Sequence, residues 1–210
     1  NVLNTPEKNS ILILSGDTEQ AVMSYLKYVE NVRPDIDLYD NYGWYFKRVV
    51  DEKYWIYNTD EAKRIQILAE KQTELIKNSG RQVYYTAGSL AGGIAGICPV
   101  QAGLIYRVDD CARKPDFSAG EKPWLSYKNE SILRSTAHDD IFTRENAGLY
   151  HYSRAEFLKN TGRQRDAAAE LKTVVEIAHD SSGLLTASAA MYASFGMMKE
   201  AISVQKKAVE

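Results

Sequence analysis

The sequence predicts an α/β domain, with a small and partly parallel sheet flanked by helices, followed by an all-α region of helical hairpins. Two observations in the first half support the α/β class: an apolar run at 11–14 precedes a helical pattern, and an alternating segment follows at 36–39. In the second half, small residues recur at a spacing of 34. Because 210 residues suffice for two small domains, we expect an α/β domain over 1–124 and a helical region over 125–210.

The first elements predict a βαβ unit. Residues 11–14 (Ile-Leu-Ile-Leu) have the length and polarity of a buried strand, and Ser15-Gly16-Asp17 suits entry into a helix. We expect Asp17 to cap this helix, with Gln20 in the capping-box position. A strand at 36–39 would then complete a parallel pair. The face expected to be buried carries Val22, Tyr25, Leu26, Val29 and Val32.

The rest of the first half predicts another helix and two more strands. Apolar spacing places the helix over 60–78, with Gly80 as the residue that follows its C-terminus. Strands are expected at 83–86 and 104–108, and an exposed connection at 109–124. The 25 residues from 82 to 106 carry no charge, but their glycines and Pro99 favour a strand followed by a Gly-rich loop over a membrane span.

The second half predicts paired helices. Asp139-Asp140 is expected to open the first of them. Gly162 and Gly196 lie 34 residues apart, as do Ala155 and Ala189, and Ala167 and Ala201. This period, with small residues at helix crossings and glycine in the turns, resembles that of tetratricopeptide repeats, here over 148–181 and 182–210.

Charge and motif content argue against several functional classes. The 26 basic and 28 acidic residues leave a net charge of −2, and no dense basic stripe indicates nucleic-acid binding. The sequence has no metal-ligand spacing, nucleophile elbow or phosphate-binding loop. We therefore expect no catalytic residues, no metal and no cofactor. Cys98 and Cys111 are expected either to form a disulfide or to be buried, unpaired thiols.

Two places carry candidate ligand-binding residues. Asp17 follows the first strand, where ligands bind in open α/β sheets. Its negative charge disfavours phosphate but leaves a sugar hydroxyl, an amine or a cation, and a simple cap is the alternative. Asp40, Asn41, Trp44 and Tyr45 lie in an aromatic-rich segment. That segment is expected to be a carbohydrate-stacking platform, a membrane-interface belt or a small aromatic core.

Several blocks of the sequence resemble a known family. Leu14-Ser15-Gly16-Asp17, Arg33-Pro34-Asp35 and Trp44-Tyr45 resemble the segment after the last membrane helix in protein O-mannosyltransferase-like proteins of bacteria and animals. Members of that family are polytopic and are similar to GT-C glycosyltransferases. Gly103 to Val108, which includes Arg107, is similar to a second family stretch, and this similarity makes Arg107 a candidate ligand-binding residue.

The resemblance implies an accessory role. The family's catalytic acid would lie in an upstream membrane loop, so this chain, which begins at Asn1 with no signal-like segment, is expected to be part of a longer protein. It would be a non-catalytic, extracytoplasmic domain that handles the acceptor protein or glycan, tethered to the membrane through the preceding part. The alternative is a tetratricopeptide-type adaptor that binds a partner peptide.

Overall fold

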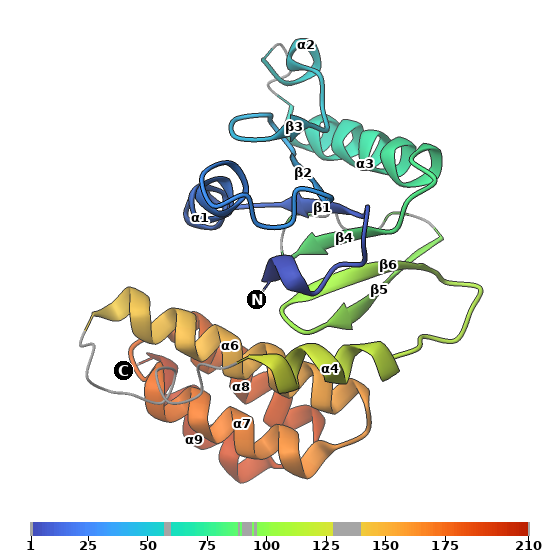
Figure 1. Ribbon diagram of the computed structural model, residues 1–210. Coiled ribbons are helices and arrows are strands. Elements are labelled where there is room, and N and C mark those ends of the chain that lie inside the picture. The colour runs from blue at the N-terminus through green and yellow to red at the C-terminus, as the bar shows by residue number, and fades with distance from the viewer. Residues whose placement is uncertain are drawn as a thin grey trace. The chain divides into compact units, whose positions relative to one another are not determined.

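The computed structural model describes residues 2–56, 60–87, 89, 94, 96–127 and 140–209 (Figure 1). The chain divides into two compact units, residues 1–123 and 124–210. The sequence predicts the boundary after residue 124, and both positions lie within the helix Ser118–Ser126. Within the described residues, no helix is both long and apolar enough to cross a membrane.

Unit 1 contains a mixed six-stranded sheet in the order β3-β2-β1-β4-β6-β5. β1 pairs in parallel with both β2 and β4, β2 pairs in parallel with β3, and β6 runs antiparallel to β4 and β5. The expected parallel pair and the partly parallel sheet are therefore confirmed. The strands are β1 Ile11–Leu14, β2 Asp37–Asp40, β3 Lys47–Arg48, β4 Val83–Thr86, β5 Ile97–Ala102 and β6 Ile105–Asp110.

The helices of this half have local signals at their ends. α3 begins after Asp60, whose carboxylate accepts hydrogen bonds from the backbone N–H groups of Ala62 and Lys63. Gly80 follows its C-terminus with φ 60°, as expected. The elements are η1 Val2–Asn4, α1 Asp17–Tyr28, α2 Glu52–Ile56, α3 Glu61–Asn78 and α4 Ser118–Ser126.

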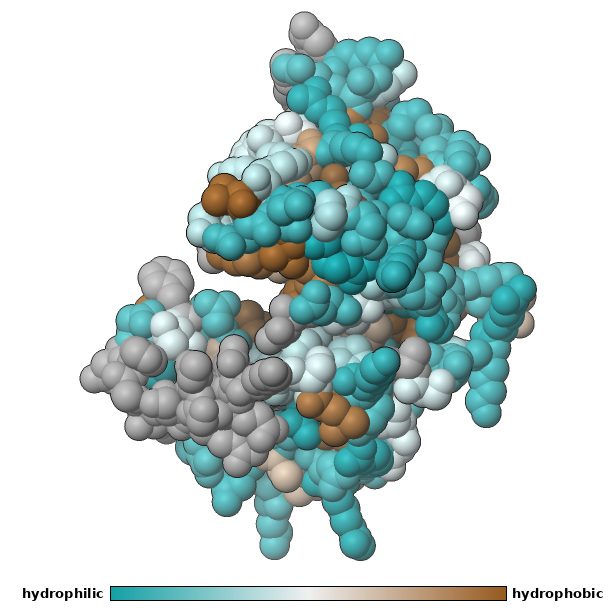
Figure 2. All heavy atoms as spheres, viewed as in Figure 1, coloured by the Kyte–Doolittle hydropathy of each residue, from teal (hydrophilic) through white to brown (hydrophobic). Residues whose placement is uncertain are grey.

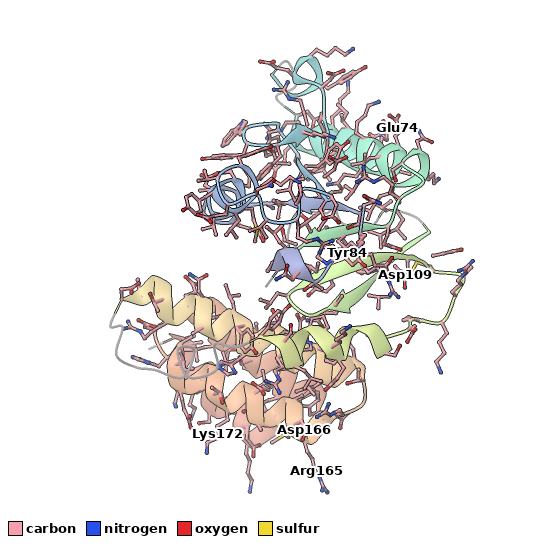
Figure 3. All side chains as sticks on the ribbon, in the orientation of Figure 1. Glu74, Tyr84, Asp109, Arg165, Asp166 and Lys172 are labelled. Carbon is pink, nitrogen blue, oxygen red and sulfur yellow. A yellow bond between two sulfur atoms is a disulfide. The ribbon has the colours of Figure 1, made fainter. Side chains whose placement is uncertain are left out.

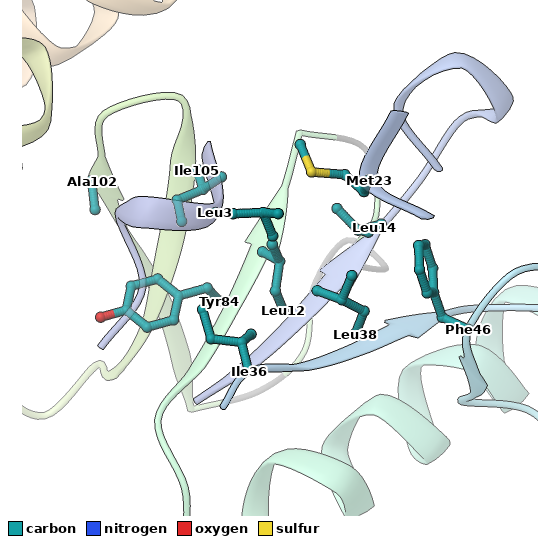
Figure 4. Packing of buried hydrophobic residues seen from close by; sticks show 10 residues of the cluster. All are labelled: Leu3, Leu12, Leu14, Met23, Ile36, Leu38, Phe46, Tyr84, Ala102 and Ile105. Carbon is teal, nitrogen blue, oxygen red and sulfur yellow. The ribbon is translucent and has the colours of Figure 1, made fainter. Parts of the chain in front are cut away.

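Alternating side chains of the strands build a core on each face of the sheet. Leu12 and Leu14 of β1 face a cluster that includes Leu3 of η1 and Met23 of α1 (Figure 4). Ile11 and Ile13 face the opposite side, in a cluster with α3 residues. Because both faces are covered, β1 is apolar at all four positions.

Two expectations about α1 are wrong. Its N-cap is Gly16, and Asp17 is the exposed first residue of the helix, with no capping hydrogen bond. The buried face was also misplaced: Val22, Tyr25 and Val29 are exposed, whereas Gln20 and Met23 are buried. Leu26 and Val32 pack against the core as expected. The sheet, and not the helix's most apolar stripe, sets this rotation.

The expected loop after β4 is wrong in its last part. Residues 97–102 form β5, an antiparallel edge strand, where Pro99 is tolerated because an edge strand leaves some N–H groups unused. The glycine-rich residues 88, 90–93 and 95 lie outside the described residues. The expected strand 104–108 is observed at 105–110, and the expected exposed connection contains α4.

Covalent and ionic links fasten the ends of the sheet. Cys98 and Cys111 form a disulfide with a Cα–Cα distance of 4.9 Å, so the disulfide alternative is confirmed. The antiparallel β5–β6 hairpin brings together residues that one extended strand would separate. At the other end, Asp37 pairs with Lys47 at 2.8 Å and with Arg81. These cations lower the pKa of Asp37.

The Arg33-Pro34-Asp35 segment fastens the start of the chain. The Arg33 guanidinium donates hydrogen bonds to the backbone carbonyls of Leu3, Pro6 and Glu7. It also forms a bidentate pair with Asp35, with both distances 2.9 Å. Arg33 itself adopts φ 52°, a left-handed conformation that is uncommon for a residue other than glycine.

Unit 2 contains two helical hairpins, α6 with α7 and α8 with α9. Gly162 and Gly196, in the two turns, have φ values of 81° and 77°, which favour glycine. Pairs at the 34-residue spacing are buried in the hairpins, among them Ala155 with Ala189 and Ala167 with Ala201. Asp140 caps α6 through the Thr143 N–H, as expected, while Asp139 lies outside the described residues. The helices are α6 Ile141–Asn160, α7 Gln164–Ile177, α8 Ser182–Ser194 and α9 Met198–Val209.

A buried glycine sets the closest approach inside unit 2. A Cβ atom added to Gly148 of α6 would lie 2.7 Å from Ala178 Cβ and 2.9 Å from Leu184 Cδ1. At Gly183, in the first turn of α8, an added Cβ would meet nothing within 4 Å. The contrast shows where the helices are packed too closely for any side chain.

Candidate functional site

Asp40 organises the aromatic segment that follows β2. Its side chain is buried, with 1% of the residue exposed, and its carboxylate accepts hydrogen bonds from five consecutive backbone N–H groups. Oδ1 accepts from residues 42, 43 and 44, and Oδ2 accepts from residues 45 and 46; the distances to Tyr42 and Phe46 are both 2.9 Å. The carboxylate therefore holds the turn from Tyr42 to Phe46 in one shape.

Asn41 is committed to a second internal network. Its Nδ2 donates to the Ser89 carbonyl at 3.1 Å, and its Oδ1 accepts from Gln72 Nε2 at 3.0 Å. Gln72 also donates to the same carbonyl at 2.7 Å. All three residues are buried, so this network joins β2, α3 and the segment after β4.

Trp44 and Tyr45 point outward from the turn that Asp40 holds. Trp44 is 69% exposed and Tyr45 is 43% exposed. The Tyr42 ring lies 6.0 Å from that of Trp44, and the Phe46 ring lies 6.4 Å from that of Tyr45. Phe46, buried in the core, also stacks on Tyr28 of α1 at 6.0 Å. We call these five side chains the aromatic platform.

The surface beside the platform is also apolar. Val22, Tyr25 and Val29 of α1 are each more than half exposed, and Figure 2 shows hydrophobic atoms at the surface over α1. Tyr25 donates a hydrogen bond to Glu30 at 2.6 Å. The apolar surface therefore continues from the platform along the outer side of α1.

Arg107 lies apart from these residues. It is on β6, opposite Tyr84 of β4, so β1 and β4 separate its strand from β2. Its guanidinium forms a bidentate pair with Asp109, with both distances 2.7 Å. Figure 3 shows Tyr84 and Asp109 in this part of the sheet. Arg107 also lines a cavity of about 340 Å³ with Arg113 and other residues of the turn after β6.

The carboxyl ends of β1 and β2 bring Asp17, Asp40 and Asn41 to one edge of the sheet, because the paired strands end together. At that edge, sequence reasoning missed Glu19. Its Oε2 accepts from Thr86 Oγ1 at 2.8 Å and from the Ser15 N–H at 3.4 Å. Burial raises the pKa of Glu19. The parallel order of β1 and β4 is the signal that could have indicated this contact.

A further cavity lies within unit 2, between α6 and α8. It has a volume of about 220 Å³. Its charged residues are Glu156 and Lys159, and the side chains of α8 that line it are small or apolar. The lining residues are Tyr152, Glu156, Lys159, Asn160, Ala187, Ala190 and Met191.

The described residues contain no group of three or more His, Cys, Asp or Glu side chains that could hold a metal ion. Comparisons with protein-family models, with curated proteins and with solved structures found no match.

Proposed function

We propose that this chain is a non-catalytic, acceptor-binding domain of a membrane glycosyltransferase-like protein, and that the aromatic platform binds glycan. One observation carries the proposal: a buried carboxylate uses both oxygens to hold five backbone amides, and the residues so held present Trp44 and Tyr45 to solvent. Exposed aromatic rings that gather in one patch mark interaction sites more often than rings scattered singly over a surface.

The chemistry of the platform suits a sugar. Aromatic rings offer flat apolar faces, and tyrosine adds a hydroxyl that can hydrogen-bond at a wet surface. Because Asp40 fixes the backbone beneath them, the rings lose little further conformational freedom on binding. The extracytoplasmic location belongs to the same proposal, and the Cys98–Cys111 disulfide supports it, since disulfides persist in oxidising compartments.

Binding of oligosaccharides to the full chain tests the proposal. A glycan array identifies a ligand, and titration calorimetry then compares wild type with Trp44→Ala and Tyr45→Ala. We expect each change to weaken binding about tenfold or more, which corresponds to ~1.4 kcal/mol. Tyr54→Ala is the matched control, because Tyr54 is an exposed tyrosine of α2 outside the platform. Glycan binding that survives both platform changes would contradict the proposal.

A second candidate function rests on the α6–α8 cavity. Here the two hairpins act as tetratricopeptide-like repeats, and an extended partner peptide lies across α6 and α8. Small residues at Ala187 and Ala190 leave room for peptide side chains, and Lys159 supplies a charge. Selection of random displayed peptides on the full chain tests this function. Enriched peptides should lose binding to Ala190→Trp, which fills the cavity, and keep binding to Trp44→Ala.

A further inference from the structure

The cavity of about 340 Å³ beside Arg107 lies on one face of the β5–β6 hairpin, within unit 1. Val100 of β5 is opposite Arg107 of β6. Cys98, two residues before Val100, is opposite Asp109. Opposite residues of an antiparallel pair project from the same face, as do residues two apart on one strand. These four side chains therefore form the strand side of the cavity, and Figure 3 labels Asp109 there.

The turn at 111–116 covers this face and forms the other side of the cavity. Its first residue forms the disulfide with Cys98, and the carbonyl of its last residue accepts a hydrogen bond from Arg107 Nη2 at 3.5 Å. Both ends of the turn are therefore held against the strands. Arg113 and Lys114, in the middle of the turn, line the cavity. The volume lies in the range of about 300–1,000 Å³ that is typical of small-molecule sites.

The carboxylates around the cavity already accept hydrogen bonds. Asp109 accepts two from Arg107, both at 2.7 Å. Oδ1 of Asp110 and Oδ1 of Asp116 each accept from the backbone N–H group two residues later, both at 2.9 Å. In addition, Asp110 follows Asp109 on β6, so its side chain projects from the opposite face of the sheet. The acidic groups on the cavity's own face are therefore Asp109, which Arg107 neutralises, and Asp116.

The cations around the cavity have donors left over. Arg113 and Lys114 are exposed, and their side chains have no hydrogen-bond or ionic partner in the part of the chain that the structure describes. A guanidinium carries five N–H groups. Arg107 uses Nε and Nη2 for Asp109, and no described residue accepts from its Nη1. Three cations with unused donors thus line one cavity, and its carboxylates leave two of the positive charges unpaired.

We infer that this cavity binds a small molecule through an anionic group, a carboxylate or a phosphate. Arg107 Nη1 donates to the anion from the strand side, and Arg113 and Lys114 donate from the turn side. Guanidinium groups match the geometry of both anions, and hydrogen bonds between charged groups are about twice as strong as those between neutral groups. Because the disulfide fixes the turn to the strands, the site is formed before the ligand binds. The inference is independent of the aromatic platform.

Nuclear magnetic resonance titration of the full chain with three sugars of similar size tests the inference. Glucuronate carries a carboxylate, glucose 6-phosphate carries a phosphate, and glucose carries neither, so the comparison identifies the anionic group. We expect at least one charged sugar to shift the backbone amide signals of Val100, Arg107 and Arg113 in a saturable way, and glucose to leave them unchanged. Trp44→Ala should bind the charged sugar as the wild type does; a loss of these shifts in Trp44→Ala would contradict a separate site.

Variants separate the cavity from general charge effects. The double change Arg113→Gln with Lys114→Gln should weaken binding about tenfold or more, and because both positions are exposed, the fold should be retained. The matched control is Lys206→Gln with Lys207→Gln, which removes two charges from adjacent exposed positions of α9 and should leave binding unchanged.

Arg107→Lys tests the strand side of the cavity. It keeps a positive charge beside Asp109 but removes the Nη1 donors, so it should also weaken binding. Equal shifts with glucose, no saturation with either charged sugar, or unchanged binding by the double variant or by Arg107→Lys would each overturn the inference.

Discussion

Replacement of Asp40 by alanine should destabilise unit 1 by about 3–7 kcal/mol. The change removes the acceptors of five backbone N–H groups. Four of these groups lie at partly buried positions, where water can replace the carboxylate, so each loss costs about 0.5–1 kcal/mol. The N–H of Phe46 is buried, and leaving it unsatisfied costs about 1–3 kcal/mol. Asp17→Ala is the matched control, since Asp17 is exposed and caps nothing.

Hydrogen exchange followed at residues 42–46 measures this effect in unit 1 alone, because global unfolding of a chain with two units is not one transition. In Asp40→Ala these amides should exchange faster by two or more orders of magnitude, by the ~1.4 kcal/mol per tenfold relation. Asp17→Ala should change protection by less than about 0.5 kcal/mol. If Asp40→Ala left the amides as protected as in the wild type, the reasoning about the turn would be refuted.

Three further predictions concern packing, covalent linkage and pH. Gly148→Ala should lower the free energy of unfolding of unit 2 by about 1 kcal/mol, because overpacking of about 1–3 kcal/mol outweighs the gain in helix propensity. Gly183→Ala, where there is room for a side chain, should raise it by about 0.5–1 kcal/mol. Urea unfolding that finds Gly148→Ala more stable than Gly183→Ala would contradict the close packing described at Gly148. Replacing Cys98 and Cys111 by serine should cost about 3 kcal/mol by loop entropy at a separation of 13 residues; a urea midpoint for unit 1 equal to that of the wild type would count against the bond. The pKa of Asp37 is lowered in the fold, so its stabilising contribution is present above the unfolded pKa of about 3.9 and is lost as pH falls through the folded value. In Asp37→Asn, the free energy of unfolding should therefore fall less steeply as the pH is lowered below about 4. An unchanged slope would mean that other carboxyl groups cause the loss of stability in acid.

Local patterns predicted the elements that local interactions decide. The apolar run of β1 and the alternation in β2 specify strands, and the intervening helix then requires a parallel pair. The sequence analysis missed β5 because Pro99 within it and the glycines on either side of it favour a loop, whereas its partner β6 supplies the hydrogen bonds of a strand. The rotation of α1 was mispredicted for a related reason. Its most apolar stripe is left exposed, and Gln20 and Met23 face inward.

The candidate site was predicted in its composition but not in its roles. The sequence singled out the aromatic segment after β2, where Trp44 and Tyr45 are exposed and Phe46 is buried in the core. The part played by Asp40, however, depends on the backbone of residues 42–46 turning around its carboxylate, which residue types alone do not specify. Glu19 was missed because its contact with Thr86 joins residues 67 apart in sequence, and only the strand order brings them together.

The Arg33 contacts have a mechanical consequence. The Arg33 guanidinium donates hydrogen bonds to three backbone carbonyls between Leu3 and Glu7. Its ion pair with Asp35 holds it beside the start of β2. A tension applied to the start of the chain is therefore carried by several hydrogen bonds loaded together, and it reaches the sheet through β2 as well as through β1. Segments linked in this parallel manner resist pulling better than segments that separate one bond at a time. The segment before β1 is thus tied both to β1, which follows it in the chain, and to the start of β2, so a pull on the chain's first residues would load two strands of the sheet.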